Sequence, residues 1–167
     1  MTGLSRRARW ELGLYRAAAT CYRGLLAARC AFDRSPQRPV LAERLGRFSG
    51  APPAPHPCIW VHAASLGEVL TATPLIARLH AEAPALRIVL TTNTATGRAA
   101  GSRTLADEVR AFPVDTPSVV RAVTARIRPV AFVFVETEIW PSLLLLLAEQ
   151  GVATALVGAS ISERTAR

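Results

Sequence analysis

The stretch that decides the fold is Val130-Ala131-Phe132-Val133-Phe134-Val135, followed at once by Glu136-Thr137-Glu138-Ile139-Trp140-Pro141. A continuous apolar run rich in Val and Phe is typical of a strand that is buried on both faces of a parallel sheet. Proline at position 141 indicates the first turn of a helix, where its missing N–H costs nothing. This part of the chain therefore predicts a strand, an acidic loop and a helix in that order.

The same order of strand, polar loop and helix recurs along residues 58–167. Further strands are expected at Cys58–Ala63, Arg87–Thr92, Val109–Phe112 and Val152–Val157. Helices are expected at Val69–Ala81, Gly97–Ala106, Pro117–Arg128 and Pro141–Gln150. Apolar strands that alternate with helices predict an α/β fold, a Rossmann-like doubly wound parallel sheet covered on both faces.

The basic charge of the chain is concentrated at its N-terminus. All 20 basic residues are Arg, and residues 1–50 carry a net charge of +7 out of a total of +8. An amphipathic helix is expected from Trp10 to Phe32, with Arg9, Arg16 and Arg23 within about 40° of one another. Such a helix is typical of one that lies among anionic lipid headgroups. The alternative is a helix that packs on the domain and leaves its Arg stripe in water.

Residues 33–57 contain six of the chain's 12 prolines, so this region cannot be one continuous helix. We expect a linker at Ser49–Pro57, so that residues 1–57 form a membrane-associating helix with a Pro-rich linker and residues 58–167 form the domain. The sequence has no window of about 18 uncharged apolar residues, so no membrane-spanning helix is predicted. Three cysteines without a CxxC spacing argue against a disulfide framework or a zinc site and indicate buried thiols.

Polar residues follow every predicted strand, at the edge where ligands bind in open parallel sheets. The loops are 62–68, 91–97, 113–117, 136–141 and 158–164. Their convergence predicts a site, although Ser65, Gly67 and Glu68 would also make an ordinary helix start. Carboxylates at 136 and 138 are harder to explain structurally, because they follow a very apolar strand. His62 fits a core histidine as well as a site residue.

Taken in order, the loops resemble the successive motifs of bacterial 3-deoxy-D-manno-octulosonic acid (Kdo) transferases. The resemblance rests on Trp60–Glu68, Thr91–Gly97, Pro113–Asp115 and Glu136–Pro141, and Leu41–Phe48 is similar to the stretch before the family's first strand. The pair Ser-x-Gly-Glu and Glu-Thr-Glu-x-Trp-Pro at this spacing is quite specific. The resemblance covers nearly all of residues 10–167.

The resemblance implies the N-terminal, acceptor-binding half of a two-domain (GT-B) glycosyltransferase that transfers Kdo from CMP-Kdo to a lipid A precursor. It implies an inverting reaction without metal or cofactor, at the cytoplasmic face of the bacterial inner membrane. Glu68 would be the general base. The substrate-binding residues would be Ser65, Gly67, Thr94, Thr96, Gly97, Glu136 and Glu138. Donor binding is expected in the second domain, so this chain alone is expected to be inactive.

One loop departs from the family pattern. Gly158-Ala159-Ser160-Ile161-Ser162 stands where Asn-Ala-Arg-Leu-Ser is common, so an amide and a guanidinium are missing. Two rival functions stay open. A non-catalytic peripheral membrane or interaction module would not need the acidic cluster, and another glycosyltransferase would use another acceptor. Nucleic-acid binding is not expected, because no recognised module or basic-aromatic interleaving accompanies the positive charge.

Overall fold

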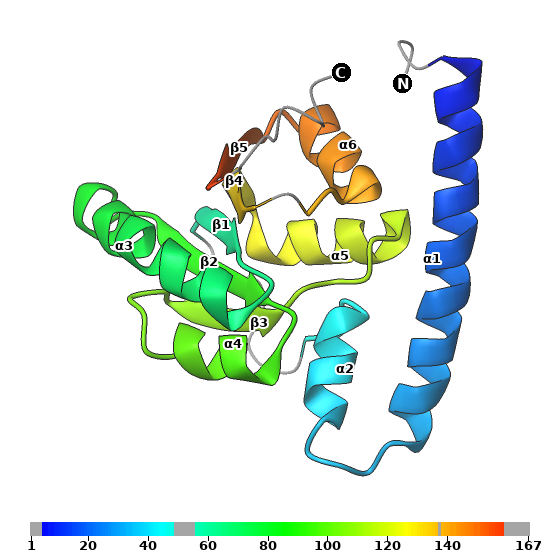
Figure 1. Cartoon of the computed structure of the whole chain (residues 1–167), viewed down its shortest axis with the longest axis horizontal. Helices are drawn as coiled ribbons and strands as arrows, with labels where there is room; N and C mark the ends of the chain where they lie inside the picture. The colour runs from blue at the N-terminus through cyan, green and yellow to red at the C-terminus, as the bar shows by residue number, and fades with distance from the viewer. Residues whose placement is uncertain (1–4, 49–55, 137, 159–167) are drawn as a thin grey trace.

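The computed structural model describes residues 5–48, 56–136 and 138–158. Its centre is a five-stranded, all-parallel sheet in the order β3-β2-β1-β4-β5 (Figure 1). The strands are β1 (Cys58–His62), β2 (Arg87–Thr92), β3 (Glu108–Ala111), β4 (Pro129–Val135) and β5 (Ala153–Val157). The predicted α/β, Rossmann-like sheet is thus confirmed, and each predicted strand matches an observed one to within a residue at either end.

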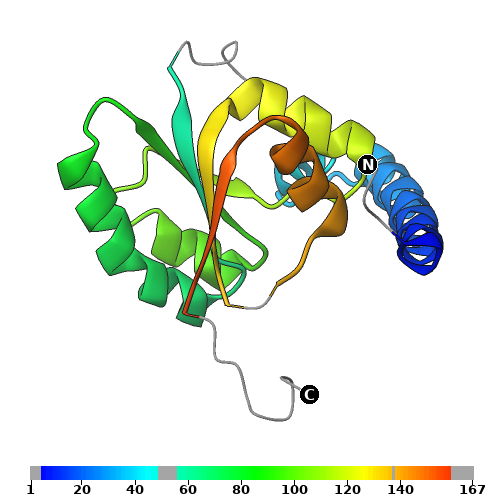
Figure 2. The same ribbon diagram turned by 90° about the horizontal axis from the view of Figure 1, so that it is seen from above.

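Helices cover the two faces of the sheet. The helices α3 (Leu66–Glu82) and α4 (Ala95–Gly101) pack on one face, and α5 (Pro117–Ile127) and α6 (Pro141–Glu149) on the other (Figure 2). The central strand β1 serves both layers, because successive side chains point to opposite faces. Trp60 packs among residues of α5 and α6, whereas Val61 packs among residues of α3.

Two expectations about burial are wrong. All five residues of β5 are exposed, because it is an edge strand and its faces are less covered than those of the inner strands. Cys21 is also exposed, since it lies on the outer side of the N-terminal helix, while Cys30 and Cys58 are buried. Burial raises the pKa of the Cys58 thiol to about 12.

The helix α4 ends at Gly101, five residues before the predicted end. Gly101 lies so close to the sheet that a Cβ there would meet Leu90 Cδ2 at 2.9 Å and Val109 Cγ1 at 3.1 Å. The chain then turns, and Thr104 donates from its N–H and its hydroxyl to the Gly101 carbonyl at 3.0 and 2.7 Å. This turn starts the approach to β3.

The N-terminal region forms a long helix, α1 (Arg6–Phe32), and a short helix, α2 (Arg38–Arg44), that the sequence did not predict. In Figure 1, α1 stands beside the domain and α2 lies between its C-terminal end and the sheet. A small apolar cluster joins the three parts. It contains Leu26, Cys30, Leu41, Leu45 and Val114.

Two arginines of the basic stripe of α1, Arg16 and Arg23, contact the domain, whereas Arg9 is exposed. Arg16 Nε donates to Ser142 Oγ and Arg23 donates to Ser118 Oγ, both at 3.4 Å, and Tyr15 Oη donates to Asp115 Oδ2 at 2.7 Å. For this stripe the structure favours packing on the domain over contact with lipid. None of the helices in the described residues has the length and apolarity needed to cross a membrane.

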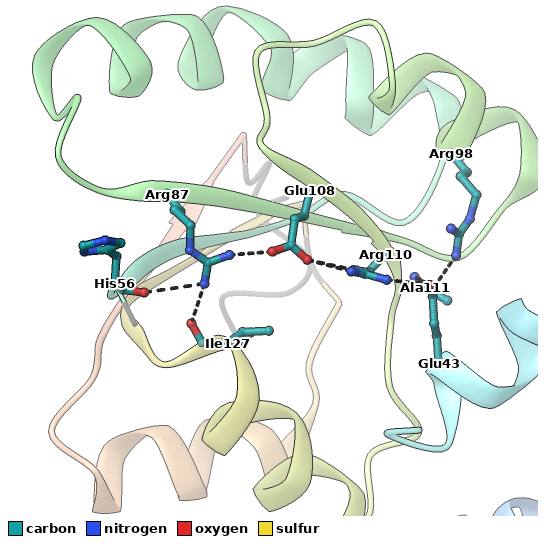
Figure 3. Close-up of polar contacts among 8 residues, drawn as sticks. All are labelled: Glu43, His56, Arg87, Arg98, Glu108, Arg110, Ala111 and Ile127. Carbon is teal, nitrogen blue, oxygen red and sulfur yellow. Dashed lines mark hydrogen bonds and ion pairs between the residues drawn. The ribbon is translucent and has the colours of Figure 1, made fainter. Parts of the chain in front are cut away.

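A chain of ion pairs fastens α2 to the edge of the sheet (Figure 3). Glu43 of α2 binds Arg98 of α4 and Arg110 of β3, and its Oε2 accepts the Ala111 N–H at 2.9 Å. Arg110 continues to Glu108, which binds Arg87. Burial raises the pKa of Glu43, but these donors outweigh it, so the net pKa lies below its usual range.

Replacing Glu43 by Gln should destabilise the chain by about 1–3 kcal/mol at pH 7, because the partly buried Arg98 and Arg110 lose the counter-charge that Glu43 supplies. The folded-state pKa is depressed, so Glu43 contributes stability above its unfolded pKa and loses it as the pH falls through the folded value. The difference in urea denaturation between wild type and Glu43→Gln should therefore shrink towards pH 3. Glu82→Gln, in an exposed pair with Arg78, is the control and should change little. An equal effect of both variants at pH 7 would contradict this role of Glu43.

Gly97 marks a second close approach, between α4 and the ends of β1 and β2. A Cβ at Gly97 would lie 2.3 Å from Thr92 Oγ1, 2.9 Å from Thr94 Oγ1 and 3.4 Å from the carbonyl carbon of Ser65. At Gly67, in the first turn of α3, a Cβ would meet nothing nearer than Ser65 Oγ at 4.0 Å. Packing therefore requires a glycine at position 97 but not at position 67.

Gly97→Ala should therefore lower the free energy of unfolding by about 1–3 kcal/mol, the usual cost of overpacking. Gly67→Ala is its matched control and should be neutral or stabilise by about 0.5 kcal/mol through the unfolded chain. Thermal and urea unfolding of both variants give the comparison. If the two alanines had the same effect, the close contact at Gly97 would not constrain the fold.

Candidate active site at the carboxyl edge of the sheet

The order of the strands places one natural site at the centre of the sheet. The order reverses between β1 and β4, since β1 is followed along the chain by its neighbour β2, while β4 lies on its other side. The loops after these two strands leave towards α3 on one face and α6 on the other. In open α/β sheets ligands bind at such a switch point, outside the carboxyl ends of the strands.

Ser65 and Glu68 form a reciprocal cap at the start of α3. Ser65 Oγ accepts the Glu68 N–H at 3.3 Å, and the Ser65 hydroxyl donates to Glu68 Oε1 at 2.8 Å. Glu68 Oε2 accepts the Ala64 N–H at 2.8 Å. Glu68 is buried and lies in the first turn of α3. Its carboxyl group is therefore close to the positive end of the helix dipole. Ser65 and Glu68 therefore also act as an ordinary helix cap, as the sequence allowed.

The predicted residues after β2 gather at the start of α4. Thr94 Oγ1 accepts the Gly97 N–H at 3.0 Å and lies 3.3 Å from Thr96 Oγ1. The loop is tied to the one after β1, because Asn93 N–H and Thr92 Oγ1 both donate to the Ala64 carbonyl, at 2.9 and 3.0 Å. A hollow of about 560 Å³ opens beside Thr94 towards Gln37 and Arg98, but neither Ser65 nor Glu68 lines it.

The two carboxylates after β4 are placed differently. Glu136 is exposed and its backbone has φ of 62°, an uncommon conformation for a residue other than glycine. Its N–H still donates to the Val157 carbonyl at 2.9 Å, so the chain turns immediately after the ladder with β5. Glu138 returns towards the sheet, where its Oε2 lies 3.1 Å from His62 Nε2.

The hydrogen bond from His62, together with the positive charge that His62 can carry, lowers the pKa of Glu138 below its usual range, and burial opposes this only in part. His62 itself is fully buried at the end of β1. Its ring stacks on Phe112 with centroids 3.8 Å apart and contacts the edge of Trp140 at 6.4 Å.

The predicted site residues thus share the carboxyl edge of the sheet, but they fall into separate groups. Ser65 and Glu68 form one group, and Thr94, Thr96 and Gly97 another that touches it. Gly67 lies in the first turn of α3, and Glu136 and Glu138 follow β4. No hydrogen bond within the described residues joins Glu68 to either of the other two carboxylates. The residues of the fifth loop from 159 onwards lie outside the described residues.

Two residues of this region have partners that the sequence does not indicate. His62, which fits a core histidine as well as a site residue, is both buried and the partner of Glu138. Asp115 stands two residues before α5, but its oxygens accept the N–H groups of Ser142 and Leu143, at 2.9 and 2.7 Å, and so cap α6. The sequence does place a histidine at the end of one predicted strand and a Glu-Thr-Glu loop after another. That combination is a signal that could have suggested the contact between His62 and Glu138.

The described residues contain no group of three His, Cys, Asp or Glu side chains arranged to hold a metal ion.

Comparison with known proteins gives one consistent family. Residues 40–167 match the family model described as 3-deoxy-D-manno-octulosonic-acid transferase. The 3-deoxy-D-manno-octulosonic acid transferase of Haemophilus influenzae is 36% identical over 149 residues, which are 87% of this chain and 34% of the relative. The transferase of Bordetella pertussis is 39% identical over 132 residues, 74% of this chain and 30% of the relative.

A similar match extends to a plant protein. The probable mitochondrial 3-deoxy-D-manno-octulosonic acid transferase of Arabidopsis thaliana is 30% identical over 125 residues, 74% of this chain and 28% of the relative. The chain thus spans about a third of the length of the curated relatives that it matches. Because the family model covers more than half of the sequence, including every strand of the sheet, the chain belongs to the Kdo transferase family.

Proposed function

We propose that this chain is the acceptor-binding part of a glycosyltransferase that transfers Kdo from CMP-Kdo to a lipid A precursor in lipopolysaccharide synthesis. The observation that carries the proposal is the position of the family motifs, with Glu68 and Glu138 both at the carboxyl edge where the strand order reverses. The donor would be bound mainly by a second domain in a GT-B arrangement. No cofactor, metal or nucleic acid has a role in this proposal.

The proposed reaction is an inverting displacement. A hydroxyl of the acceptor glucosamine attacks the anomeric carbon of Kdo, the bond to the CMP phosphate breaks, and a carboxylate takes the hydroxyl proton. Glu68 is the proposed base. Ser65, Gly67, Thr94, Thr96 and Gly97 would bind the acceptor from the α3 and α4 side, with Glu136 and Glu138 opposite.

The contacts of Glu68 set a condition for this role. Both of its oxygens accept hydrogen bonds, from the Ala64 N–H and the Ser65 hydroxyl. To accept a substrate proton, Glu68 must exchange the Ser65 hydroxyl for the acceptor hydroxyl while the Ala64 N–H continues to orient it.

Contact of α1 with an anionic membrane surface is also part of the proposal, with the cytoplasmic face of the bacterial inner membrane as its place. Its support is a stripe of large apolar side chains on the face of α1 that points away from the domain. The stripe contains Trp10, Leu14, Leu25 and Phe32, of which Trp10 is 73% exposed. Arg6, Arg7 and Arg29 are exposed on the same helix. Apolar residues at an interface with flanking Arg suit a helix lying in the headgroup region.

The first test is Glu68→Gln in a full-length protein that carries this chain. Loss of the base should lower the rate of Kdo transfer to a lipid A precursor by about 100-fold or more. The amide can still accept from Ala64, so the melting temperature should change by only a few degrees. Glu82→Gln, at the other end of α3, is the control and should retain full activity. Turnover near the wild-type rate in Glu68→Gln would remove Glu68 from the mechanism.

The second test addresses the membrane. Leu14→Ser combined with Leu25→Ser should weaken binding to vesicles with anionic lipid about tenfold or more, since each leucine contributes roughly 1–2 kcal/mol when buried in the interface. Leu70→Ser removes an equally exposed leucine from α3 and should leave binding unchanged. Vesicle co-sedimentation at low and high salt measures both. Equal binding by all three proteins would exclude this stripe as the membrane contact.

A further inference from the structure

His62 is a buried titratable side chain that the proposed reaction does not use. It ends β1 at the switch point and is 0% exposed, so no substrate can touch it. Within the described residues it hydrogen-bonds one charged side chain, Glu138, whose side chain is 36% exposed. Glu138 can therefore contact a ligand on its exposed side while His62 hydrogen-bonds it from the buried side.

The surroundings of His62 decide which of its nitrogens carries hydrogen. Nδ1 lies 3.0 Å from the Thr91 carbonyl oxygen and 3.1 Å from Thr91 Oγ1. A neutral ring with hydrogen on Nε2 can accept the Thr91 hydroxyl at Nδ1, and a protonated ring can donate from Nδ1 to the carbonyl. A neutral ring with hydrogen only on Nδ1 would turn a lone pair towards the Glu138 carboxylate. Both favourable states therefore donate from Nε2 to Glu138.

The buried neighbours hold this arrangement in place. The indole N–H of Trp60 donates to Thr91 Oγ1 at 2.8 Å, so the Thr91 hydroxyl uses its own hydrogen for one of two acceptors, His62 Nδ1 at 3.1 Å or the Val61 carbonyl at 3.4 Å. When it donates to His62, a continuous series of donors runs from Trp60 through Thr91 and His62 to Glu138. Stacking on Phe112 at an interplanar angle of 26° fixes the plane of the imidazole. Trp60 and Thr91 are buried as completely as His62, so water does not compete for these bonds.

We propose that His62 is a positioning residue that holds the Glu138 carboxylate in one orientation at the carboxyl edge for a hydroxyl group of the acceptor sugar. This inference rests on the proposed function only for the identity of the ligand. The pKa of Glu138, lowered by the hydrogen bond from His62, agrees with the geometry. A carboxylate held in this way can accept a hydrogen bond from a sugar hydroxyl without first rotating.

The first arm of the test measures Glu138 itself. A ¹³C NMR titration of the Glu138 side chain should give a pKa below the usual value in the wild-type chain. His62→Phe keeps the stacked ring and removes the donor, so the pKa of Glu138 should rise towards its usual value. His62→Gln keeps an N–H near the Nε2 position and should give a smaller rise.

The control for this arm is Val61→Ala, which changes a buried residue on the opposite face of β1. It should destabilise the chain and leave the pKa of Glu138 unchanged. An unchanged pKa in His62→Phe, or an equal rise in Val61→Ala, would overturn the proposal. This arm requires no enzymatic activity, so it decides the pairing even if the proposed function is wrong.

The second arm is a double-mutant cycle on Kdo transfer by the full-length protein. His62→Phe and Glu138→Gln should each lower kcat/KM about tenfold or more, because the first removes the donor that orients the carboxylate and the second removes the carboxylate itself. The double variant should lose little beyond the more impaired single variant, because His62 acts through Glu138. Additive losses, or full activity in His62→Phe while Glu138→Gln is impaired, would overturn the positioning role.

Discussion

The parallel pairing of β1 with β4 is the constraint on which the site depends. The ladder runs from Cys58 opposite Pro129 to His62 opposite Phe134, so both strands end at the same edge. The helices that follow, α3 and α6, leave to opposite faces, and both turn their N-termini to this edge. A carboxyl group lies at each of these two N-termini. Glu68 lies in the first turn of α3, and Asp115 accepts the first N–H groups of α6. The positive helix ends favour such charges at this edge.

Much of this architecture could be predicted from the sequence, because the inner strands are short apolar runs bounded by turn residues. Pro117 and Pro141 marked helix starts correctly. The failures among the helices have a common cause, which is tertiary contact. The helix α4 ends where Gly101 meets the sheet, and α2 is stabilised by Glu43 and an apolar cluster rather than by its own seven residues. Local sequence does not record such partners.

The candidate site divides in the same way. That Ser65, Glu68, Thr94 and Glu138 share an edge followed from parallel strands alone, and the structure confirms this placement. Their partners did not follow. Glu138 pairs with His62, 76 residues away along the chain, and Asp115 caps a helix that begins 26 residues later rather than its own. Sequence spacing predicts which end of a strand a residue occupies, but not which buried donor it meets.

The same contacts join the N-terminal helix to the site. Tyr15 of α1 donates to Asp115, and this carboxylate holds the first turn of α6. Directly before α6, Trp140 packs on Phe112 with centroids 4.8 Å apart, and Phe112 stacks on His62. Burial and the nearby Asp115 raise the pKa of Tyr15, so its hydroxyl stays a donor at neutral pH. The outward apolar stripe of α1 and the carboxyl edge are therefore held in a fixed relation by directional contacts. Under the proposed function, this relation would fix the position of the site relative to the membrane surface.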